Sequence, residues 1–493
     1  MASPSPLFRF LPPLTRTLSL AGLIASFGIA PALAQQENSE TFRTAALQAL
    51  GGDATGLAFS GAGWDACLGQ AWSVDEGWAR WELTDYQRVI NYQDGNSRHT
   101  TQRRAGLNPD HIGGCGAQPN ASPSPQQGFI NGSSAWLDQL NIWLTPHGFV
   151  HLMAEGQPVI TGEQGGWRVE LPLERGGIDY RLIGQFNADH QLQNVTTWVD
   201  DSVFGDMEVQ AEYGPYRDFG ALSFPASLTV NQGGSATLHL DITAVAPSDE
   251  TLEAPPPRGG GGGGGAAPAG PAYSEIGPGI FAIAGAYQSV AVEFADHVVV
   301  IDGLQSDARA AQIIAAVNEA IPNKPIRYVV STHSHFDHAS GLRQFAALGA
   351  TVLTHDMNVA FFQQALSTPR TLRVNPTEPD TVPVKVQGVG EHLVLSDDAG
   401  QTVELYPLGV SQHAADMLIA YLPGINTVVE ADVLQPWISP AFGGTNGPHP
   451  FLIYLAAALE RLGLDYQHFV PVHVPPNPPL MERAELQAVL SGQ

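Results

Sequence analysis

The sequence has little positive charge. Among its 493 residues, 22 lysines and arginines stand against 48 aspartates and glutamates, and the only lysines are Lys324 and Lys385. The formal net charge of −26 repels phosphate backbones and anionic lipid, because basic side chains supply most of the affinity for both. We therefore expect no nucleic-acid partner, and we interpret the acidic excess as a means of keeping the protein soluble.

Long hydrophobic runs are missing as well. The apolar segment near the N-terminus, residues 18–29, is shorter than the roughly 20 residues that a membrane-spanning helix needs. Arg9 and Arg16 precede it and the small residues PALA follow it, an order typical of a secretory signal peptide. We predict a signal peptide at residues 1–34, cleaved after Ala34, and a periplasmic or secreted protein with no stable membrane span after cleavage. The alternative is an uncleaved membrane anchor.

Cysteine is equally scarce, since Cys67 and Cys115 are the only two. In an oxidising compartment an even pair is a reasonable disulfide candidate, so we predict that the two are bonded to each other. Two unpaired thiols are the alternative. No metal or catalytic role is expected of them, because neither a Cys-x-x-Cys spacing nor a nearby histidine cluster accompanies them.

A proline- and glycine-rich stretch divides the chain. Residues 254–272 include seven consecutive glycines, from Gly259 to Gly265, and such a composition cannot bury a core. We interpret this stretch as a flexible linker between an N-terminal domain at residues 35–253 and a C-terminal domain at residues 273–493. The length of the chain also favours two folded units.

The N-terminal domain shows the pattern of half-buried strands. Apolar and polar residues alternate at 168–171, 195–199 and 236–240, between frequent glycine, asparagine and aspartate. This pattern predicts a β-rich, mostly antiparallel domain, with a helix near residues 40–50. Its tryptophans could line a ligand surface, but core positions are the more common place for them. We predict no role for this domain.

The C-terminal domain alternates strands with helices. Apolar runs at 280–283, 289–301 and 326–331 predict strands, and the apolar residues within 313–321 share one face of a helix that Pro322 ends. Alternation of this kind predicts an α/β layered domain.

The sequence THSHFDHASG, at residues 332–341, carries the chemistry of this domain. His333, His335, Asp337 and His338 fall within six residues directly after a predicted strand. Imidazole and carboxylate together suit zinc and other divalent first-row ions. A lone histidine is usually structural, but four such groups crowded together need a cation to offset their desolvation and mutual repulsion. The motif therefore predicts a metal site.

This motif resembles that of the metallo-β-lactamase superfamily of hydrolases, and the resemblance covers about residues 273–493. Three further ligand positions of that family match in order, each after a predicted strand: His413, Asp432 and His473. The resemblance implies an αββα sandwich and two zinc ions per chain. It implies that His333, His335 and His413 hold one ion, that Asp337, His338 and His473 hold the other, and that Asp432 bridges them.

The resemblance also implies roles for these residues. Two neighbouring ions share a water whose pKa falls toward neutrality, which generates a bridging hydroxide while the ions polarise the bond under attack. Asp337 would also manage a proton in catalysis, as in relatives. A weaker candidate is Asp302, which stands where relatives place a carboxylate that orients a ligand histidine, although a turn before Gly303 explains it equally well. His449, in a loop on the expected substrate side, is another.

One position departs from the family pattern. Relatives commonly have glycine after the last ligand, whereas Val474 follows His473 here. A β-branched residue disfavours positive φ, so we expect an altered backbone path and weaker binding of the second ion. Two other stretches, residues 369–372 and 421–432, look like those of a group of exported metallo-hydrolases with an added N-terminal domain, which favours the two-domain architecture.

Fold does not select the substrate in this superfamily. Familiar β-lactamases generally lack a bridging carboxylate such as Asp432, whereas the glyoxalase, lactonase and phosphodiesterase branches generally have one. The resemblance thus implies an exported metal-dependent hydrolase of a small ester, lactone, thioester or related bond, with a small-molecule substrate. The alternatives are a metallo-β-lactamase that hydrolyses β-lactam antibiotics, a ligand-binding protein with a structural metal site, and a metal store or sensor. The sequence makes no prediction of the oligomeric state.

Overall fold

The computed structural model describes residues 38–104, 124–255, 272–373, 383–434, 450–473 and 479–491, all of which belong to one compact unit, residues 36–493. The predicted signal peptide, Cys115, most of the predicted linker and His449 lie outside the described residues. Within the described part, no helix combines the length and the apolar composition that a membrane crossing requires.

The N-terminal half is built on one 11-stranded sheet with the order β4-β3-β2-β1-β13-β12-β9-β8-β7-β6-β5. All of its neighbouring strands are antiparallel, and a separate hairpin pairs β10 with β11. The strands are β1 (Gly56–Ala66), β2 (Arg80–Asn91), β3 (Asn96–Arg104), β4 (Ser124–Ile130), β5 (Val159–Glu163), β6 (Gly166–Arg175), β7 (Ile178–Asn187), β8 (Leu192–Asp201), β9 (Gly205–Tyr213), β10 (Tyr216–Phe219), β11 (Leu222–Pro225), β12 (Ser227–Gln232) and β13 (Ser235–Pro247).

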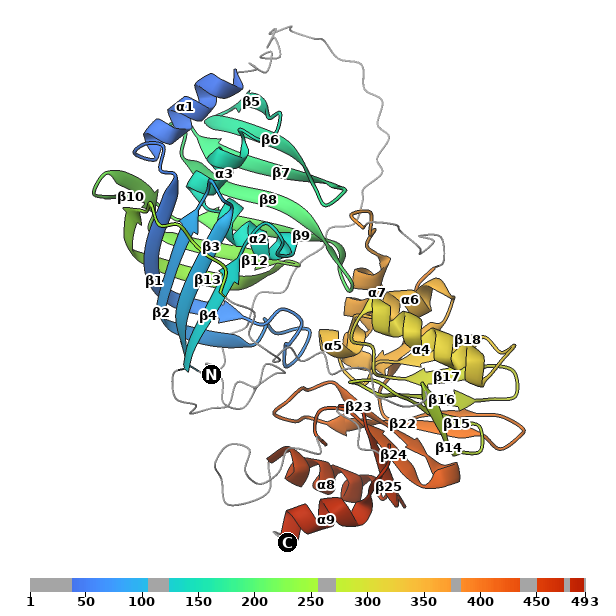
Figure 1. Cartoon of the computed structure of the whole chain (residues 1–493). Coiled ribbons are helices and arrows are strands. Elements are labelled where there is room, and N and C mark those ends of the chain that lie inside the picture. The colour runs from blue at the N-terminus through green and yellow to red at the C-terminus, as the bar shows by residue number, and fades with distance from the viewer. Residues whose placement is uncertain are drawn as a thin grey trace, which may run out of the picture. The chain divides into compact units, whose positions relative to one another are not determined.

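Burial along these strands follows the pleat. In β9 every second residue is buried, as expected for a sheet that turns one face to a core. Three helices complete this half: α1 (Ser39–Ala49), α2 (Trp136–Trp143) and α3 (Pro146–Leu152). Figure 1 shows the sheet curving around α2 and α3, and the enclosed side chains form one apolar core. The predicted antiparallel β-rich fold and the helix near residues 40–50 are confirmed.

The C-terminal half contains two sheets, one of seven strands in the order β14 to β20 and one of six in the order β21 to β26. Figure 1 shows α4, α6 and α7 beside the first sheet, and α8 and α9 beside the second. The strands are β14 (Tyr273–Gly277), β15 (Ile280–Ile283), β16 (Ser289–Glu293), β17 (Val298–Ile301), β18 (Ile326–Val330), β19 (Thr351–His355), β20 (Lys385–Val389), β21 (Leu393–Ser396), β22 (Thr402–Gly409), β23 (Met417–Leu422), β24 (Thr427–Glu430), β25 (His468–Pro471) and β26 (Met481–Glu482). The helices are α4 (Asp307–Ala320), α5 (Phe336–Ala339), α6 (Leu342–Ala347), α7 (Val359–Ser367), α8 (Pro450–Leu462) and α9 (Arg483–Ser491), with short 3-10 turns at Asp356–Asn358 and Pro423–Ile425.

Three apolar clusters hold these layers together. The middle cluster lies between the sheets, where Val330 and Leu353 of the first pack with Leu405 and Val429 of the second. One outer cluster joins α4, α6 and α7 to the first sheet, and the other joins α8 and α9 to the second. The result is a four-layer αββα arrangement, which confirms the predicted fold class.

Residues 369–372 bind the C-terminal half to β9 of the N-terminal half. Pro369 O accepts a hydrogen bond from Asp206 N at 2.8 Å, and the Asp206 carboxylate accepts from Thr371 N and Leu372 N at 2.8 and 3.0 Å. The preceding Gly205 has φ 74°, and a Cβ there would lie 2.4 Å from Pro369 O. Glycine is therefore required at this approach of two backbones.

Two arginines strengthen the same contact. Arg370 is 6% exposed and pairs with Asp200 of β8 and Asp307 of α4. Arg343 of α6 donates to Val203 O at 3.1 Å. Residues 369–372, whose sequence favours the two-domain architecture, thus hold the C-terminal half against the N-terminal half.

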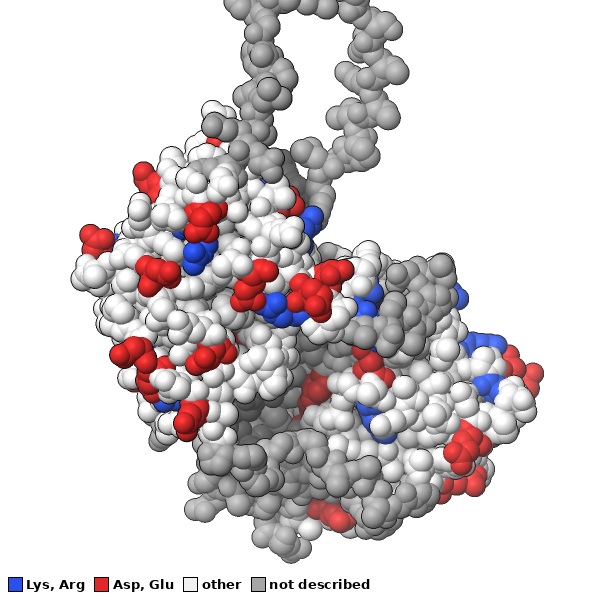
Figure 2. Space-filling model, turned by 45° about the horizontal axis from the view of Figure 1, so that its top comes forward, with Lys and Arg blue, Asp and Glu red and all other residues white. Residues whose placement is uncertain are grey.

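Acidic side chains dominate the charged surface. Figure 2 shows them spread over the face in view, with basic side chains fewer and interspersed. This distribution agrees with the net charge of −26.

Candidate metal centre

The predicted ligands lie at the ends of strands in both sheets of the C-terminal half. The loop after β18 and the short helix α5 carry the HxHxDH motif, and the loops after β22, β24 and β25 each bring one further residue. Within each of two groups the ligand atoms lie within 4.8 Å of one another. The groups share one residue: they are His333, His335, His413 and Asp432, and Asp337, His338, Asp432 and His473.

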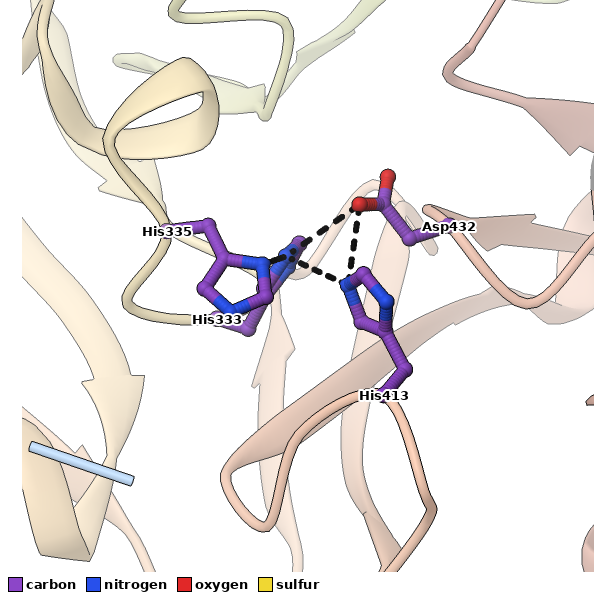
Figure 3. Close-up of side chains that lie close together, drawn as sticks. All are labelled: His333, His335, His413 and Asp432. Carbon is purple, nitrogen blue, oxygen red and sulfur yellow. Dashed lines mark hydrogen bonds and ion pairs between the residues drawn. The ribbon is translucent and has the colours of Figure 1, made fainter. Parts of the chain in front are cut away.

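In the first group, drawn in Figure 3, three imidazoles face one carboxylate. His333 Nε2 lies 3.0 Å from His335 Nδ1 and 3.3 Å from His413 Nε2. Asp432 Oδ2 lies 3.0 Å from His413 Nε2 and 3.5 Å from His333 Nε2. All four side chains are buried, so solvent does not separate these atoms.

The second group lies on the other side of the same carboxylate. His338 Nε2 and His473 Nε2 are 3.1 Å apart, and Asp432 Oδ1 lies 2.9 and 2.6 Å from them. Asp337 Oδ2 lies 3.6 and 3.7 Å from the same two nitrogens. Asp432 therefore turns one oxygen toward each group. Its φ of 66° is unusual for a residue other than glycine, and such backbone strain is concentrated at functional sites.

Hydrogen bonds outside the groups fix which ring nitrogen carries the proton. Ala71 O lies 2.8 Å from His335 Nε2 and can only accept, so Nδ1 of His335 is unprotonated when the ring is neutral. Asp302 Oδ1 lies 2.8 Å from His338 Nδ1, which leaves Nε2 of His338 unprotonated in the same way. Thr332 donates its hydroxyl proton to Asp302 and lies 3.1 Å from His333 Nδ1, so it accepts there and leaves His333 Nε2 unprotonated.

In all three histidines the unprotonated nitrogen is the one that faces its group. Lone pairs from several rings, pointed at one spot beside a carboxylate, fit a bound cation. Nitrogen and oxygen donors of this kind suit zinc. Residue chemistry and geometry thus agree with two metal positions that share Asp432.

Burial and the neighbouring charges shift the pKa values of these groups in different directions. Burial, and then the charge of His333, holds the pKa of His335 well below its ordinary value. Burial lowers the pKa of His338, but the carboxylates of Asp302 and Asp432 outweigh it and hold that pKa well above its ordinary value. Burial raises the pKa of Asp432, yet His338 and other histidines outweigh it and hold the pKa well below its ordinary value. The shared carboxylate therefore stays ionised.

Asp302 holds the ring of His338 by a contact between its carboxylate and Nδ1. It is fully buried, has φ 54°, and its carboxylate also accepts from Gly303 N and from the Thr332 hydroxyl. A carboxylate in this position sets the orientation and tautomer of the histidine it holds.

A loop of the N-terminal half, residues 67–72, reaches the centre. Gln70 Nε2 donates to Asp337 Oδ1 at 2.8 Å, and Gly69 O accepts from Phe336 N at 3.0 Å. Gly69 has φ 77°, and a Cβ there would lie 2.2 Å from the Phe336 ring. Sequence reasoning missed this loop, because it lies far from the motif in sequence and acts partly through backbone carbonyls that every residue has.

Tyr287 was also missed. Its hydroxyl donates to Asp337 Oδ2 at 2.8 Å, and its ring centroid lies 3.9 Å from that of His473. Burial raises the pKa of Tyr287, and the Asp337 charge raises it further, so the hydroxyl keeps its proton. Asp337 thus has a neutral donor on each oxygen, Gln70 on one and Tyr287 on the other.

A hollow of about 360 Å³ lies beside the first group. The ring of Phe451 lies 5.6 Å from the His413 ring, and Trp72 of the N-terminal loop donates through Nε1 to Ser411 O at 2.7 Å. The hollow therefore has aromatic walls from both halves of the chain. Its lining consists of Trp72, Val410, Ser411, Gln412, Pro450, Phe451 and Tyr454.

Three predicted positions are not placed. Cys67 is in a disulfide, but Cys115 lies outside the described residues, so the pairing of these two stays a prediction. His449 and Val474 lie outside them too, and the predictions that depend on them stand as before.

Residues 283–455 match the model of the metallo-beta-lactamase superfamily, which confirms the predicted resemblance and enzyme class, a metal-dependent hydrolase, for this domain. Among curated proteins, the chain is 24% identical over 193 residues to the alpha subunit of 2,4-dinitroanisole O-demethylase from Nocardioides sp. strain JS1661. That match covers 38% of this chain and 53% of the relative, so the chain spans about half the length of the curated relative it matches.

Solved structures give distant matches to this half. A metallo-beta-lactamase from Pontibacter korlensis is 18% identical, with a TM-score of 0.33, over 44% of this chain and 96% of that one. The mono-zinc form of the metallo-beta-lactamase FIM-1 from Pseudomonas aeruginosa is 19% identical, with a TM-score of 0.31, over 44% and 92%. The sec-alkylsulfatase Pisa1 from Pseudomonas sp. is 19% identical, with a TM-score of 0.31, over 44% and 40%.

Proposed function

We propose that this chain, whose C-terminal half is a metallo-beta-lactamase superfamily domain, is a dinuclear, zinc-dependent hydrolase of a small ester, lactone or thioester. One observation carries the proposal: Asp432 turns Oδ2 toward three histidines and Oδ1 toward the second group. Two ions that share a carboxylate lie close enough to act on one bond. A structural zinc needs only four ligands and no second group, which argues against a purely structural metal.

The residues of the centre have two roles: some would hold the ions, and others position those ligands. His333, His335 and His413 would hold one ion and Asp337, His338 and His473 the other, with Asp432 between them. Bound in this way, the ions would supply a Lewis acid and a hydroxide nucleophile at neutral pH. The chain itself holds the imidazoles of His333, His335 and His338 each in one tautomer and buries the first group. Gln70 and Tyr287 fix Asp337, the residue best placed to carry a proton during turnover.

The aromatic hollow beside His413 indicates what part of the substrate the enzyme recognises. Trp72, Phe451 and Tyr454 line this hollow, and the Phe451 ring lies 5.6 Å from that of His413, so we propose an apolar or aromatic substituent next to the scissile bond. The curated relative is named for an aromatic compound, 2,4-dinitroanisole, which agrees with such a wall. A β-lactam remains the second candidate substrate, because the proposed export would place the enzyme where those antibiotics arrive.

We also propose that the enzyme works outside the cytoplasm, in the periplasm or as a secreted protein, on a small molecule. The signal-like N-terminal sequence supports this location, and a disulfide at Cys67 is typical of an oxidising compartment. Cell fractionation followed by N-terminal sequencing of the mature protein checks it. A cytoplasmic protein that retains residues 1–34 would contradict it.

The test of the activity is a panel of aryl esters, lactones, thioesters, phosphodiesters, sulfate esters and β-lactams, assayed with the zinc-loaded protein. We expect zinc-dependent turnover of an ester, lactone or thioester that His335→Ala abolishes. His392→Ala is the matched control, since His392 lies at the surface beside Glu404. If only β-lactams are hydrolysed, the enzyme is a β-lactamase rather than a hydrolase of esters, lactones or thioesters. A His335→Ala variant that loses thermal stability and zinc while no substrate reacts would instead favour a structural metal.

A further inference from the structure

A second cavity lies inside the N-terminal half and shares no lining residue with the metal centre. Its volume is about 510 Å³, within the range of roughly 300–1,000 Å³ that small-molecule sites occupy. It lies between the inner face of the 11-stranded sheet and α2, which Figure 1 shows within the curve of that sheet. Neither the superfamily match nor the proposed hydrolysis accounts for it.

One wall of this cavity, on β2 and β3, is polar. Arg88 is its central side chain and is only 4% exposed. Its Nε donates to the Tyr86 hydroxyl at 2.6 Å, and its Nη1 donates to Ser97 Oγ at 3.0 Å. Both partners are neutral, so these contacts fix the guanidinium in place without balancing its charge.

The described residues provide Arg88 with no carboxylate partner. The other arginine of the cavity, Arg103, is paired with Asp65. Asp138, the remaining lining carboxylate, is exposed on α2 and makes no ion pair with Arg88. A buried charge without a counter-charge is unfavourable, so a bound anion would restore balance where the protein does not.

The opposite wall is mostly apolar, although Asn141, Gln232 and Thr237 also line it. Strands β9, β12 and β13 and helix α2 turn aliphatic side chains into the cavity, and these belong to the main core of this half. A ligand that fills the space must therefore carry both an anionic group and an apolar body. The aliphatic lining consists of Leu137, Leu140, Leu144, Val209, Leu228, Val230 and Leu238.

We propose that this cavity binds a small amphipathic carboxylate, with its carboxylate on Arg88 and its hydrocarbon part against α2 and the β9–β12–β13 wall. Arginine suits this role because its planar guanidinium forms paired, charge-assisted hydrogen bonds with carboxylates. His99 lines the polar wall directly opposite Arg88 in the β2–β3 register and supplies a further polar group near the carboxylate. The site is independent of the proposed hydrolase function.

The test compares three ten-carbon probes on the full protein after removal of bound lipid: decanoate, 1-decanol and decyltrimethylammonium. Displacement of a fluorescent apolar dye reports binding of each. We expect decanoate to bind about tenfold or more tightly than 1-decanol, and the cation to bind weakest, because a charge-assisted hydrogen bond separates them. Equal affinity for decanoate and 1-decanol would overturn the proposal.

Two variants locate the binding. Arg88→Gln should remove the preference for decanoate over 1-decanol, while Arg98→Gln, on the opposite face of β3 and paired with Glu250, should keep it. If Arg88→Gln does not fold, Leu137→Trp fills the apolar side of the cavity at a partly exposed position and should weaken decanoate and 1-decanol together. Decanoate binding unchanged in Leu137→Trp, or lost equally in the two arginine variants, would place the ligand elsewhere.

Discussion

Replacement of Asp302 by asparagine should weaken one metal site and leave the other intact. The Asp302 carboxylate is fully buried and accepts from His338 Nδ1, Gly303 N and the Thr332 hydroxyl. Asparagine keeps the shape but loses the charge, and one of its two terminal atoms becomes a donor. The oxygen that accepts from His338 Nδ1 also accepts from Gly303 N, so the amide nitrogen takes the other position, beside Thr332, and His338 keeps its tautomer but loses its charged partner.

The size of the effect follows from this contact. Loss of the partner that orients a ligand histidine typically costs about 10–100-fold in metal affinity. His338 belongs to the second group only, so we expect a loss of that size for the second zinc equivalent and little change for the first. Thr332 also contacts His333, but its hydroxyl proton can turn away from the new amide, so that its oxygen accepts from the amide and still accepts from His333 Nδ1.

Competition with a chromophoric chelator resolves the two equivalents of zinc. Asp416→Asn is the matched control: Asp416 is equally buried, and it accepts hydrogen bonds from Ser334 N and Asn358 Nδ2 rather than from an imidazole. The titration of the unsubstituted protein also tests the expectation, based on Val474, that the second ion binds more weakly. Asp302→Asn with two equivalents as tight as in the parent protein, or the same loss in Asp416→Asn, would refute the assignment of Asp302 to His338.

Three further variants test other parts of the structure. Gln70→Leu removes the donor to Asp337 Oδ1 and should lower kcat/KM about tenfold, whereas Gln87→Leu, on an exposed part of β2, should leave it unchanged in a steady-state assay. Arg370→Leu leaves Asp200 and Asp307 without their buried partner and should cost about 3 kcal/mol in urea unfolding, against about 0–1 kcal/mol for the exposed Arg327→Leu. Burial lowers the pKa of His147 from 6.5 to about 3 in the folded chain. Between these values the unfolded chain binds the proton and the folded chain does not, so stability is present above pH 6.5 and lost as the pH falls. His147→Phe should therefore remove up to about 3 kcal/mol of the difference in stability between pH 7 and pH 4, and unfolding curves with the same pH dependence as the parent would contradict this.

Periodicity in the sequence was enough to predict the layers. The run at 280–283 coincides with β15, and the helix that Pro322 ends is α4, because apolar residues at strand and helix spacing must turn to a core. The tryptophans behaved mostly as expected, since Trp78, Trp136 and Trp143 are buried. Trp72 is different: it lines the hollow beside His413, and nothing in its local pattern separates it from the others.

Within the metal centre too, some residues could be predicted from the sequence and others could not. The four ligands of the HxHxDH motif could be named in advance, because histidine and aspartate are donor types that a metal requires and their spacing places them after one strand. The other three, His413, Asp432 and His473, were identified through the resemblance. The partners of those residues follow no such rule. Asp302 was identified only through resemblance. Tyr287 and Gln70 carry common polar groups that become donors to Asp337 only in the folded chain, Tyr287 from another loop of the same half and Gln70 from the N-terminal half.

The contact between His335 and Ala71 shows why the role of the loop at residues 67–72 could not be predicted from the sequence. The acceptor is a backbone carbonyl, so any residue at position 71 supplies it, provided that the loop takes the same path. The path depends instead on Gly69, which alone fits against Phe336, and on the docking of residues 369–372 on β9. The tautomer of His335 is thus set by packing between segments more than 260 residues apart in the chain. A metal ligand predicted from its own motif therefore depends, for the nitrogen it presents, on the half of the chain whose role the sequence left undefined.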